Sequence, residues 1–203
     1  MLIQCFSCPP IETNTYLIAC ESSREAAVID PGLESYEHVQ ASVKEHQLTL
    51  SRVLLTHSHW DHIVEAATFN KEIPVYVHPL DASNVLQPGS DGLSLPLPIK
   101  GCTSILDLEE GKKYSLGNLT FTVIHTPGHS KGSVCLYFES EKTLFSGDTL
   151  FQGTYGKITL PTSQPELMGP SLKRLALLPP STIVYPGHGP ATQIGHETWL
   201  NTV

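Results

Sequence analysis

The sequence has few basic residues, and this shortage excludes two classes of partner. Lysine and arginine together number 12 against 20 aspartates and glutamates, which gives a formal net charge of -8 at pH 7. Such an acidic balance disfavours a broad phosphate-binding surface and provides no polybasic face for attachment to a membrane. We therefore expect neither nucleic acid nor a membrane among the partners of this protein.

The sequence also lacks long apolar runs and paired cysteines. No stretch reaches the roughly 18 apolar residues of a membrane span, and the N-terminal sequence MLIQCFSCPP does not resemble an export signal. We therefore expect a cytoplasmic protein. The five cysteines are an odd number, which disfavours the disulfide framework of a secreted protein. Cys5 and Cys8 have CxxC spacing, but no second pair completes a four-sulfur metal site, so ordinary strand cysteines are the better interpretation.

Length and patterning predict an α/β protein in one domain, residues 1–203, with enough apolar side chains (40% hydrophobic) for a proper core. Strands are expected at residues 2–5, 14–20, 26–29, 52–55, 75–77, 119–124, 133–138, 143–145 and 182–185. Helices are expected at residues 35–47, 62–70, 79–86, 164–178 and 194–200. Residues 87–101 have the composition of a surface loop or lid, because strands resume after them.

Four of the expected strands lead into a residue of a metal-binding type. These residues are His57, His129, Asp148 and His188. In layered α/β proteins the ends of neighbouring strands meet in one crevice, where ligands and metals collect. A glycine precedes each of the last three residues and permits a tight turn that directs the side chain into this crevice.

The segment THSHWDH, residues 56–62, strengthens this prediction. By chance, the pattern HxHxDH would occur in this composition with a probability on the order of one in a thousand. Imidazole nitrogens suit zinc, iron and related cations, and a carboxylate can bridge two ions. Seven ligands are enough for two metals if one ion is held by His57, His59 and His129, the other by Asp61, His62 and His188, and Asp148 lies between them. Two such ions would lower the pKa of a bound water from 15.7 to about 7, which makes a hydroxide available at neutral pH.

The motifs THSHWDH, TPGHS, SGDTLF and YPGHGPAT, in this order, resemble those of the metallo-β-lactamase superfamily. Together with NTYLI and AVIDPG they are most similar to its short glyoxalase II-like hydrolases. The resemblance implies a four-layer αββα sandwich of two mixed β-sheets flanked by helices, and the metal ligands named above. It also implies a thioesterase of the hydroxyacylglutathione hydrolase type, in which a metal-bound hydroxide attacks a small acyl-thiol and Asp61 orients the water. Zinc is the first expectation for the two divalent ions, with iron or manganese as alternatives.

Two departures from glyoxalase II bear on the substrate. Full-length glyoxalase II carries a C-terminal helical domain that contacts glutathione, and no such domain follows in this sequence, so recognition of glutathione is left open. Short relatives often have the sequence GRTD where this chain has residues 156–159, GKIT. Lys157 resembles the glyoxalase II lysine that contacts a substrate carboxylate, and we predict this role for it; the alternative is a solvated loop lysine.

Other functions use the same motifs. A persulfide dioxygenase with one iron would need only His57, His129 and Asp148 as ligands and would be an oxidoreductase. A dinuclear hydrolase of another substrate is also consistent with the ligand set. A β-lactam hydrolase is disfavoured by the lack of an export signal, and an RNA-processing role is disfavoured by the acidic balance.

Overall fold

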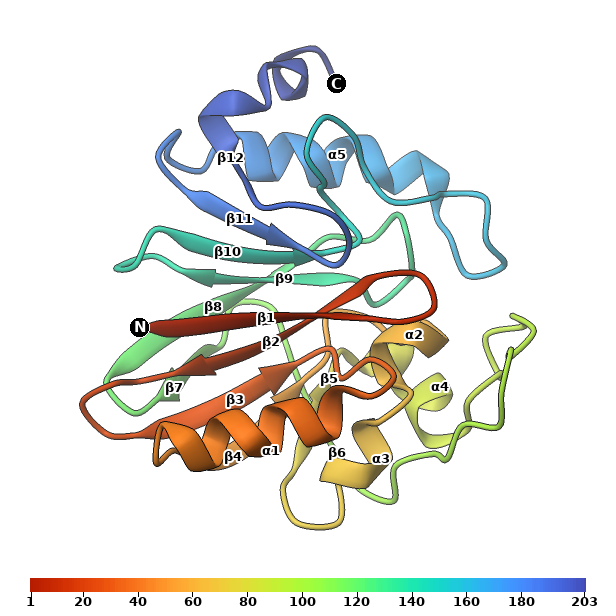
Figure 1. Cartoon of the computed structure of the whole chain (residues 1–203). Coiled ribbons are helices and arrows are strands. Elements are labelled where there is room, and N and C mark those ends of the chain that lie inside the picture. The colour runs from red at the N-terminus through yellow and green to blue at the C-terminus, as the bar shows by residue number, and fades with distance from the viewer.

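The computed structural model describes all residues, 1–203, and contains two six-stranded mixed sheets that pack face to face (Figure 1). The first sheet has the order β1 (Leu2–Cys8), β2 (Thr13–Ala19), β3 (Glu25–Ile29), β4 (Thr49–Leu54), β5 (Val75–Val77) and β6 (Ile105–Asp107). The second has the order β12 (Thr192–Gln193), β11 (Ile183–Pro186), β10 (Thr143–Gly147), β9 (Val134–Phe138), β8 (Leu119–His125) and β7 (Lys113–Leu116). Each half of the chain therefore supplies one sheet.

The helices connect parallel strands and cover the outer faces of the sandwich. Strands β3 to β6 run parallel, and so do β10 and β11. Parallel neighbours need a crossover connection, which is usually helical. The crossovers contain α1 (Ser35–Glu45), α2 (Trp60–Ile63), α3 (Ala66–Phe69), α4 (Ala82–Leu86) and α5 (Pro165–Ala176), with α1 and α5 on opposite sides of the molecule (Figure 1). None of these helices combines the length and the apolar character needed to cross a membrane.

Three apolar clusters hold the layers together. On β2, Leu17 and Ala19 pack toward the helices of the first sheet, whereas Tyr16 and Ile18 pack into the cluster between the two sheets. This alternation follows from the two-residue period of a strand, and both faces of β2 are buried. A third cluster lies between the second sheet and α5. The predicted αββα sandwich is thus confirmed.

Several elements differ from the sequence prediction. The short strands β6, β7 and β12 were not predicted, because two to four residues at or near sheet edges carry little periodic signal. The helix expected at residues 62–70 is divided into α2 and α3. Between them, the Glu65 carboxylate accepts hydrogen bonds from the backbone N–H groups of Glu34 and Tyr36, at the start of α1. The helix expected at residues 194–200 consists of two 3-10 turns, η2 (Ile194–His196) and η3 (Thr198–Thr202).

Cys5 and Cys8 lie on opposite faces of β1, since an odd separation reverses the side-chain direction in a strand. Cys5 is exposed, and Cys8 is buried with its Sγ 3.3 Å from Thr15 Oγ1. The two sulfurs therefore do not form a joint metal or redox site, which fits their interpretation as ordinary strand cysteines.

Candidate functional site

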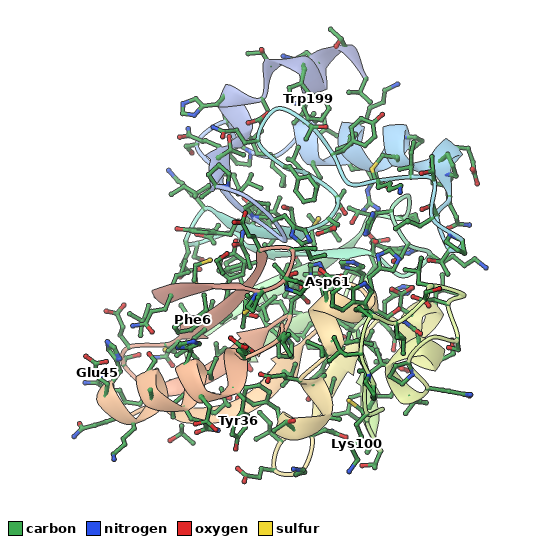
Figure 2. All side chains as sticks on the ribbon, turned by 45° about the vertical axis from the view of Figure 1, so that its right-hand side comes forward. Phe6, Tyr36, Glu45, Asp61, Lys100 and Trp199 are labelled. Carbon is green, nitrogen blue, oxygen red and sulfur yellow. The ribbon has the colours of Figure 1, made fainter.

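The seven predicted ligand side chains come together at one edge of the sandwich, where strand ends of both sheets meet. The first sheet supplies four of them through the loop after β4 and through α2, and the second sheet supplies three from the ends of β8, β10 and β11. Figure 2 shows Asp61 at the junction of the two halves of the molecule. Six of the seven residues are buried, and His188, with 24% of its side chain exposed, lies at the opening.

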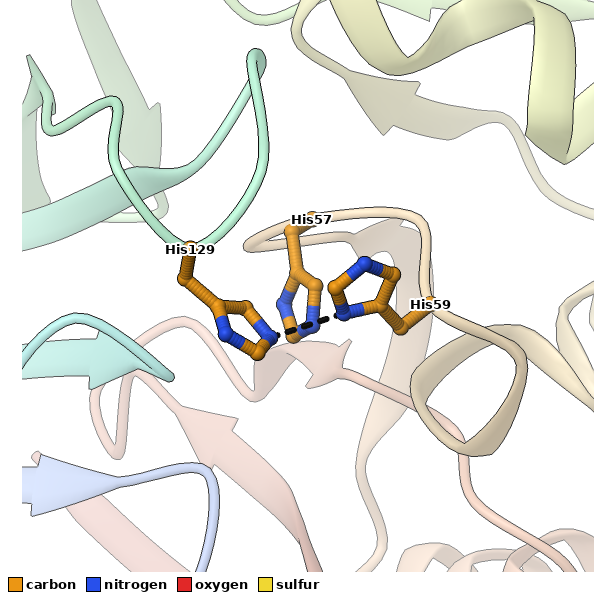
Figure 3. Close-up of side chains that lie close together, drawn as sticks. All are labelled: His57, His59 and His129. Carbon is orange, nitrogen blue, oxygen red and sulfur yellow. Dashed lines mark hydrogen bonds between the residues drawn. The ribbon is translucent and has the colours of Figure 1, made fainter. Parts of the chain in front are cut away.

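Three histidines form the first group, here called the three-histidine group: His57, His59 and His129. Their ligand nitrogens lie within 4.8 Å of one another. The rings converge from two loops, and a hydrogen bond of 2.7 Å joins His59 Nδ1 to His129 Nε2 (Figure 3). His57 Nε2 is buried and has no hydrogen-bond partner in the protein. A divalent ion could be held among these nitrogens.

The second group, here called the Asp-His-His group, consists of Asp61, His62 and His188. Asp61 Oδ2 lies 3.1 Å from His62 Nε2 and 3.2 Å from His188 Nε2. Asp148 lies between the two groups, with Oδ1 3.4 Å from His62 Nε2 and Oδ2 3.3 Å from His129 Nε2. Asp148 Oδ2 also lies 3.6 Å from His188 Nε2, so this carboxylate contacts both groups and would be placed to serve two ions.

The buried carboxylates of the cluster carry negative charge that bound cations would neutralise. Asp30, Asp61 and Asp148 are all buried around His62, and no lysine or arginine lines the cavity beside them. Burial alone lowers the pKa of His62, but these three carboxylates outweigh it and raise the pKa above its usual range. A proton on His62 therefore supplies positive charge that bound cations would otherwise provide. Buried charges of one sign are costly unless they are paired or coordinate metals.

The donor atoms also fit divalent cations. His62 Nε2 and Asp148 Oδ1, like His57 Nε2, are buried without a hydrogen-bond partner. Burial lowers the pKa of His59 to about 3, so its imidazole is neutral at physiological pH. Neutral imidazole is the form that binds a metal.

The outward nitrogen of each histidine is held by a partner in the surrounding protein. These partners are Thr56 Oγ1 for His57 Nδ1 (3.1 Å), Thr162 Oγ1 for His59 Nε2 (3.4 Å), Asp30 Oδ2 for His62 Nδ1 (3.0 Å), the Lys157 carbonyl for His129 Nδ1 (2.7 Å) and the Ile11 carbonyl for His188 Nδ1 (3.1 Å). Such contacts set the tautomer and the ring orientation of metal-ligating histidines. The opposite nitrogen of each ring is thereby directed into the cluster.

Comparison with known proteins gives the family. Residues 8–188 match the model of the metallo-beta-lactamase superfamily. The chain belongs to this superfamily. It is 32% identical over 190 residues to the probable metallo-hydrolase YqgX of Bacillus subtilis, covering 91% of this chain and 89% of YqgX. It is 36% identical over 193 residues to the cytoplasmic hydroxyacylglutathione hydrolase of Arabidopsis thaliana, covering 90% of this chain and 66% of the plant protein.

Solved structures of the superfamily share the architecture over almost the whole chain. The BLEG-1 B3 metallo-beta-lactamase superimposes with a TM-score of 0.86 at 37% identity, covering 97% of this chain and 96% of BLEG-1. TTHA1623 in a di-iron-bound form superimposes with a TM-score of 0.81 at 38% identity, with 96% of both chains covered. ETHE1 from Myxococcus xanthus superimposes with a TM-score of 0.82 at 27% identity, covering 100% of this chain and 85% of ETHE1. These likenesses confirm the fold, and the family match together with the similarity to the probable metallo-hydrolase YqgX supports a metal-dependent hydrolase.

In this member of the superfamily, two residues that the sequence analysis did not assign support the ligands. Asp30 follows β3 and accepts hydrogen bonds from Thr56 N (2.7 Å) and Thr56 Oγ1 (2.6 Å), in addition to its contact with His62. Thr13, on β2, donates its hydroxyl hydrogen bond to Asp61 Oδ2 at 2.7 Å. Asp30 lies in the AVIDPG motif, and Thr13 directly precedes the NTYLI motif. Both residues therefore stood in or beside recognised motifs, but no role was assigned to them.

The NTYLI motif also holds the loop that carries His188. Asn14 Nδ2 donates to the carbonyls of Pro186 (3.0 Å) and Gly189 (2.8 Å), which flank this histidine. The Tyr16 hydroxyl donates to the Pro186 carbonyl at 2.6 Å. The N-terminal strands of the first sheet therefore position a ligand of the second sheet.

A cavity of about 220 Å³ opens over the cluster. Besides five candidate ligands it is lined by Ile11, Trp60, Leu93, Ser94 and Leu160. Two of these residues belong to the predicted lid, residues 87–101. Trp60, inside the THSHWDH segment, thus lines the cavity over the cluster.

The predicted substrate contact, Lys157, lies on the loop beside this cavity. Its side chain is exposed and does not line the cavity, while its carbonyl accepts the hydrogen bond from His129 Nδ1. The contact of its ammonium group with a substrate stays a prediction.

Proposed function

We propose that this protein is a thioesterase of the hydroxyacylglutathione hydrolase type, which cleaves a small acyl-thiol in the cytoplasm. The observation that carries the proposal is the pair of three-ligand groups, joined by Asp148, at the floor of a small cavity. The 36% identity to the Arabidopsis hydroxyacylglutathione hydrolase supports this reaction class. Two divalent ions, with zinc as the first expectation, would be held by the seven residues.

When bound, such ions supply an activated water molecule and positive charge near the substrate carbonyl. The residues of the chain orient the reactants. Thr13 holds Asp61 by Oδ2, and Asp61 Oδ1 accepts no hydrogen bond from the protein. This free oxygen can orient a water molecule by accepting a hydrogen bond from it. The imidazoles stay in place because their outward nitrogens are held.

The cavity wall favours an acyl-thiol over a phosphate ester. Ile11, Leu93 and Leu160 are apolar, and the lining includes no lysine or arginine. Apolar walls exclude water from the reacting carbonyl, which strengthens the electrostatic interactions inside the cavity. The wall provides no cationic side chain that would add to the charge of the ions in binding a phosphoryl group.

The test is hydrolysis of S-D-lactoylglutathione, with a neutral acyl-thiol such as S-lactoyl-N-acetylcysteamine measured in parallel. We expect the zinc-loaded protein to release thiol from at least one of them, and a chelator to remove the activity. The same preparation is given nitrocefin, because BLEG-1 is a B3 metallo-beta-lactamase. Turnover of nitrocefin without thiol release, or no turnover from protein that holds two ions, would contradict the thioesterase proposal.

A second candidate is the oxygenation of a persulfide at an iron centre. The likeness to ETHE1 from Myxococcus xanthus supports this candidate, and the di-iron form of TTHA1623, at 38% identity, is an example of iron bound in this fold. Oxygen uptake by the iron-loaded protein with glutathione persulfide separates this function from hydrolysis. The complete Asp-His-His group favours hydrolysis, because a single iron would not need it.

Replacing Lys157 by methionine tests the predicted substrate contact. If the ammonium group binds a substrate carboxylate, the Lys157→Met variant should show a KM for S-D-lactoylglutathione raised by roughly tenfold, as expected for a lost charged contact of about 1.4 kcal/mol. The metal content should not change, because only the backbone carbonyl of Lys157 contacts a ligand. Lys131→Met, another exposed lysine, is the control. Equal KM values for the Lys157 and Lys131 variants would show that the Lys157 side chain is a solvated loop lysine that does not contact the substrate.

A further inference from the structure

Asp81 is a buried carboxylate that connects the two loops of the three-histidine group. It ends the 3-10 turn η1 (Pro79–Asp81), and only 4% of the residue is exposed. Its Oδ2 accepts hydrogen bonds from the backbone N–H of Ser58 (2.8 Å) and the hydroxyl of Ser130 (2.9 Å). Its Oδ1 accepts one from the backbone N–H of Gly132 (2.8 Å).

The partners of Asp81 are the immediate neighbours of the three histidines. Ser58 separates the two histidines of the first loop, and Ser130 directly follows the histidine of the second loop. The Ser58 peptide is held on its other side as well, because Asn84 Nδ2 donates to its carbonyl at 2.6 Å. No residue of the Asp-His-His group, and none adjacent to one, bonds to Asp81. Its contacts therefore concern only one of the two groups.

The loop that carries His129 lies very close to Asp81 at Gly132. A Cβ atom on Gly132 would lie 2.6 Å from Asp81 Cγ, a distance that real side chains do not adopt. Glycine at this position permits the Gly132 N–H to reach the carboxylate. The sequence THSHWDH and the loop after TPGHS thus meet through one side chain that neither motif contains.

We propose that Asp81 is a positioning residue for the three-histidine group: it sets the separation of the two loops and with it the affinity of that group for a divalent ion. This inference rests on the proposed function in so far as it requires the histidines to bind metal. Asp81 touches no ligand atom itself. It acts through the Ser58 and Ser130 contacts, in the way that outer partners commonly affect metal affinity by about 10- to 100-fold.

The test is zinc binding by the full chain, measured by calorimetry and by metal content per chain. Asp81→Asn keeps the side-chain size, but whichever way the amide is turned, its NH₂ faces a backbone N–H of Ser58 or Gly132. We expect one of the two ions to bind at least about tenfold more weakly, and the other to keep its wild-type Kd. Gly132→Ala, which keeps the carboxylate but displaces it, should weaken the same ion and covers the case in which Asp81→Asn does not fold.

Glu197→Gln is the matched control. Glu197 is equally buried, at 4% exposure, and also accepts three hydrogen bonds, from Gly153 N, Thr192 Oγ1 and Trp199 Nε1, away from the ligands. It should lower the melting temperature without changing zinc binding. Two ions bound to the Asp81 and Gly132 variants with wild-type affinity, or equal weakening in the Glu197 variant, would overturn the positioning role alone. A wild-type chain that binds no zinc would overturn the proposed function together with this inference.

Discussion

Replacing Asp148 by alanine is expected to lower kcat for thioester hydrolysis by roughly 1,000-fold or more. Even a group that only supports a metal ligand is worth about 10- to 100-fold, and Asp148 is the one carboxylate that faces both ligand groups. A 1,000-fold loss corresponds to about 4 kcal/mol of transition-state stabilisation. The alanine variant lacks the carboxylate that lies between His62 and His129. The measurement is kcat for the better of the two acyl-thiol substrates, together with zinc content per chain.

The control for this variant is Asp107→Ala. Asp107 is an exposed carboxylate on the edge strand β6 and makes no side-chain hydrogen bond, so its removal changes the net charge equally without touching the cluster. It should keep wild-type activity and metal content. An Asp148→Ala variant that binds two ions and retains more than about a tenth of the activity would contradict a bridging role for Asp148.

The candidate ligands could be selected from the sequence because their signal is local. Each follows a short apolar strand, and three are preceded by a glycine, so the pattern can be recognised without knowledge of the fold. The structure brings all seven together at one edge of the sandwich, five of them lining the cavity and His57 and His62 buried behind it; their binding of ions stays a prediction that the zinc measurements test. The sandwich could be predicted for a different reason, since the order of the motifs resembles a known superfamily.

The residues that hold the ligands could not be selected in the same way. Asp30 lies 32 positions before His62, and Thr13 lies 48 positions before Asp61, so their contacts exist only after the strands have assembled. The division between α2 and α3 has a similar origin. The Glu65 N–H donates to the Pro31 carbonyl at 3.1 Å instead of continuing the helix, and the Glu65 carboxylate accepts hydrogen bonds at the start of α1. Polar contacts of this kind depend on tertiary approach, which periodicity does not report.

Replacing Asp30 by asparagine is expected to lower the affinity of the Asp-His-His group for its ion by about 10- to 100-fold. The affinity of the three-histidine group should change less. Asp30 has φ of 50°, in the left-handed region that asparagine also tolerates, so the backbone should not change. The amide oxygen can still accept the Thr56 N–H. The amide NH₂ then takes the place of Oδ2 and donates to Thr56 Oγ1 and to His62 Nδ1, which must become an acceptor.

Metal binding requires His62 to be neutral, and this reversal moves the single proton of that neutral form from Nδ1 to Nε2, the nitrogen that faces Asp61 and Asp148. A protonated Nε2 cannot bind a metal, so the variant loses affinity although every ligand residue is present. Zinc titration measures the loss, and nitrogen NMR of the imidazoles identifies the tautomer. Asp107→Asn is the control, and two zinc ions bound to the Asp30 variant with wild-type affinity would contradict the role of Asp30. Asp30→Asn and Asp81→Asn should weaken the binding of different ions. The pair of variants therefore distinguishes a defect in one ligand group from a general loss of stability.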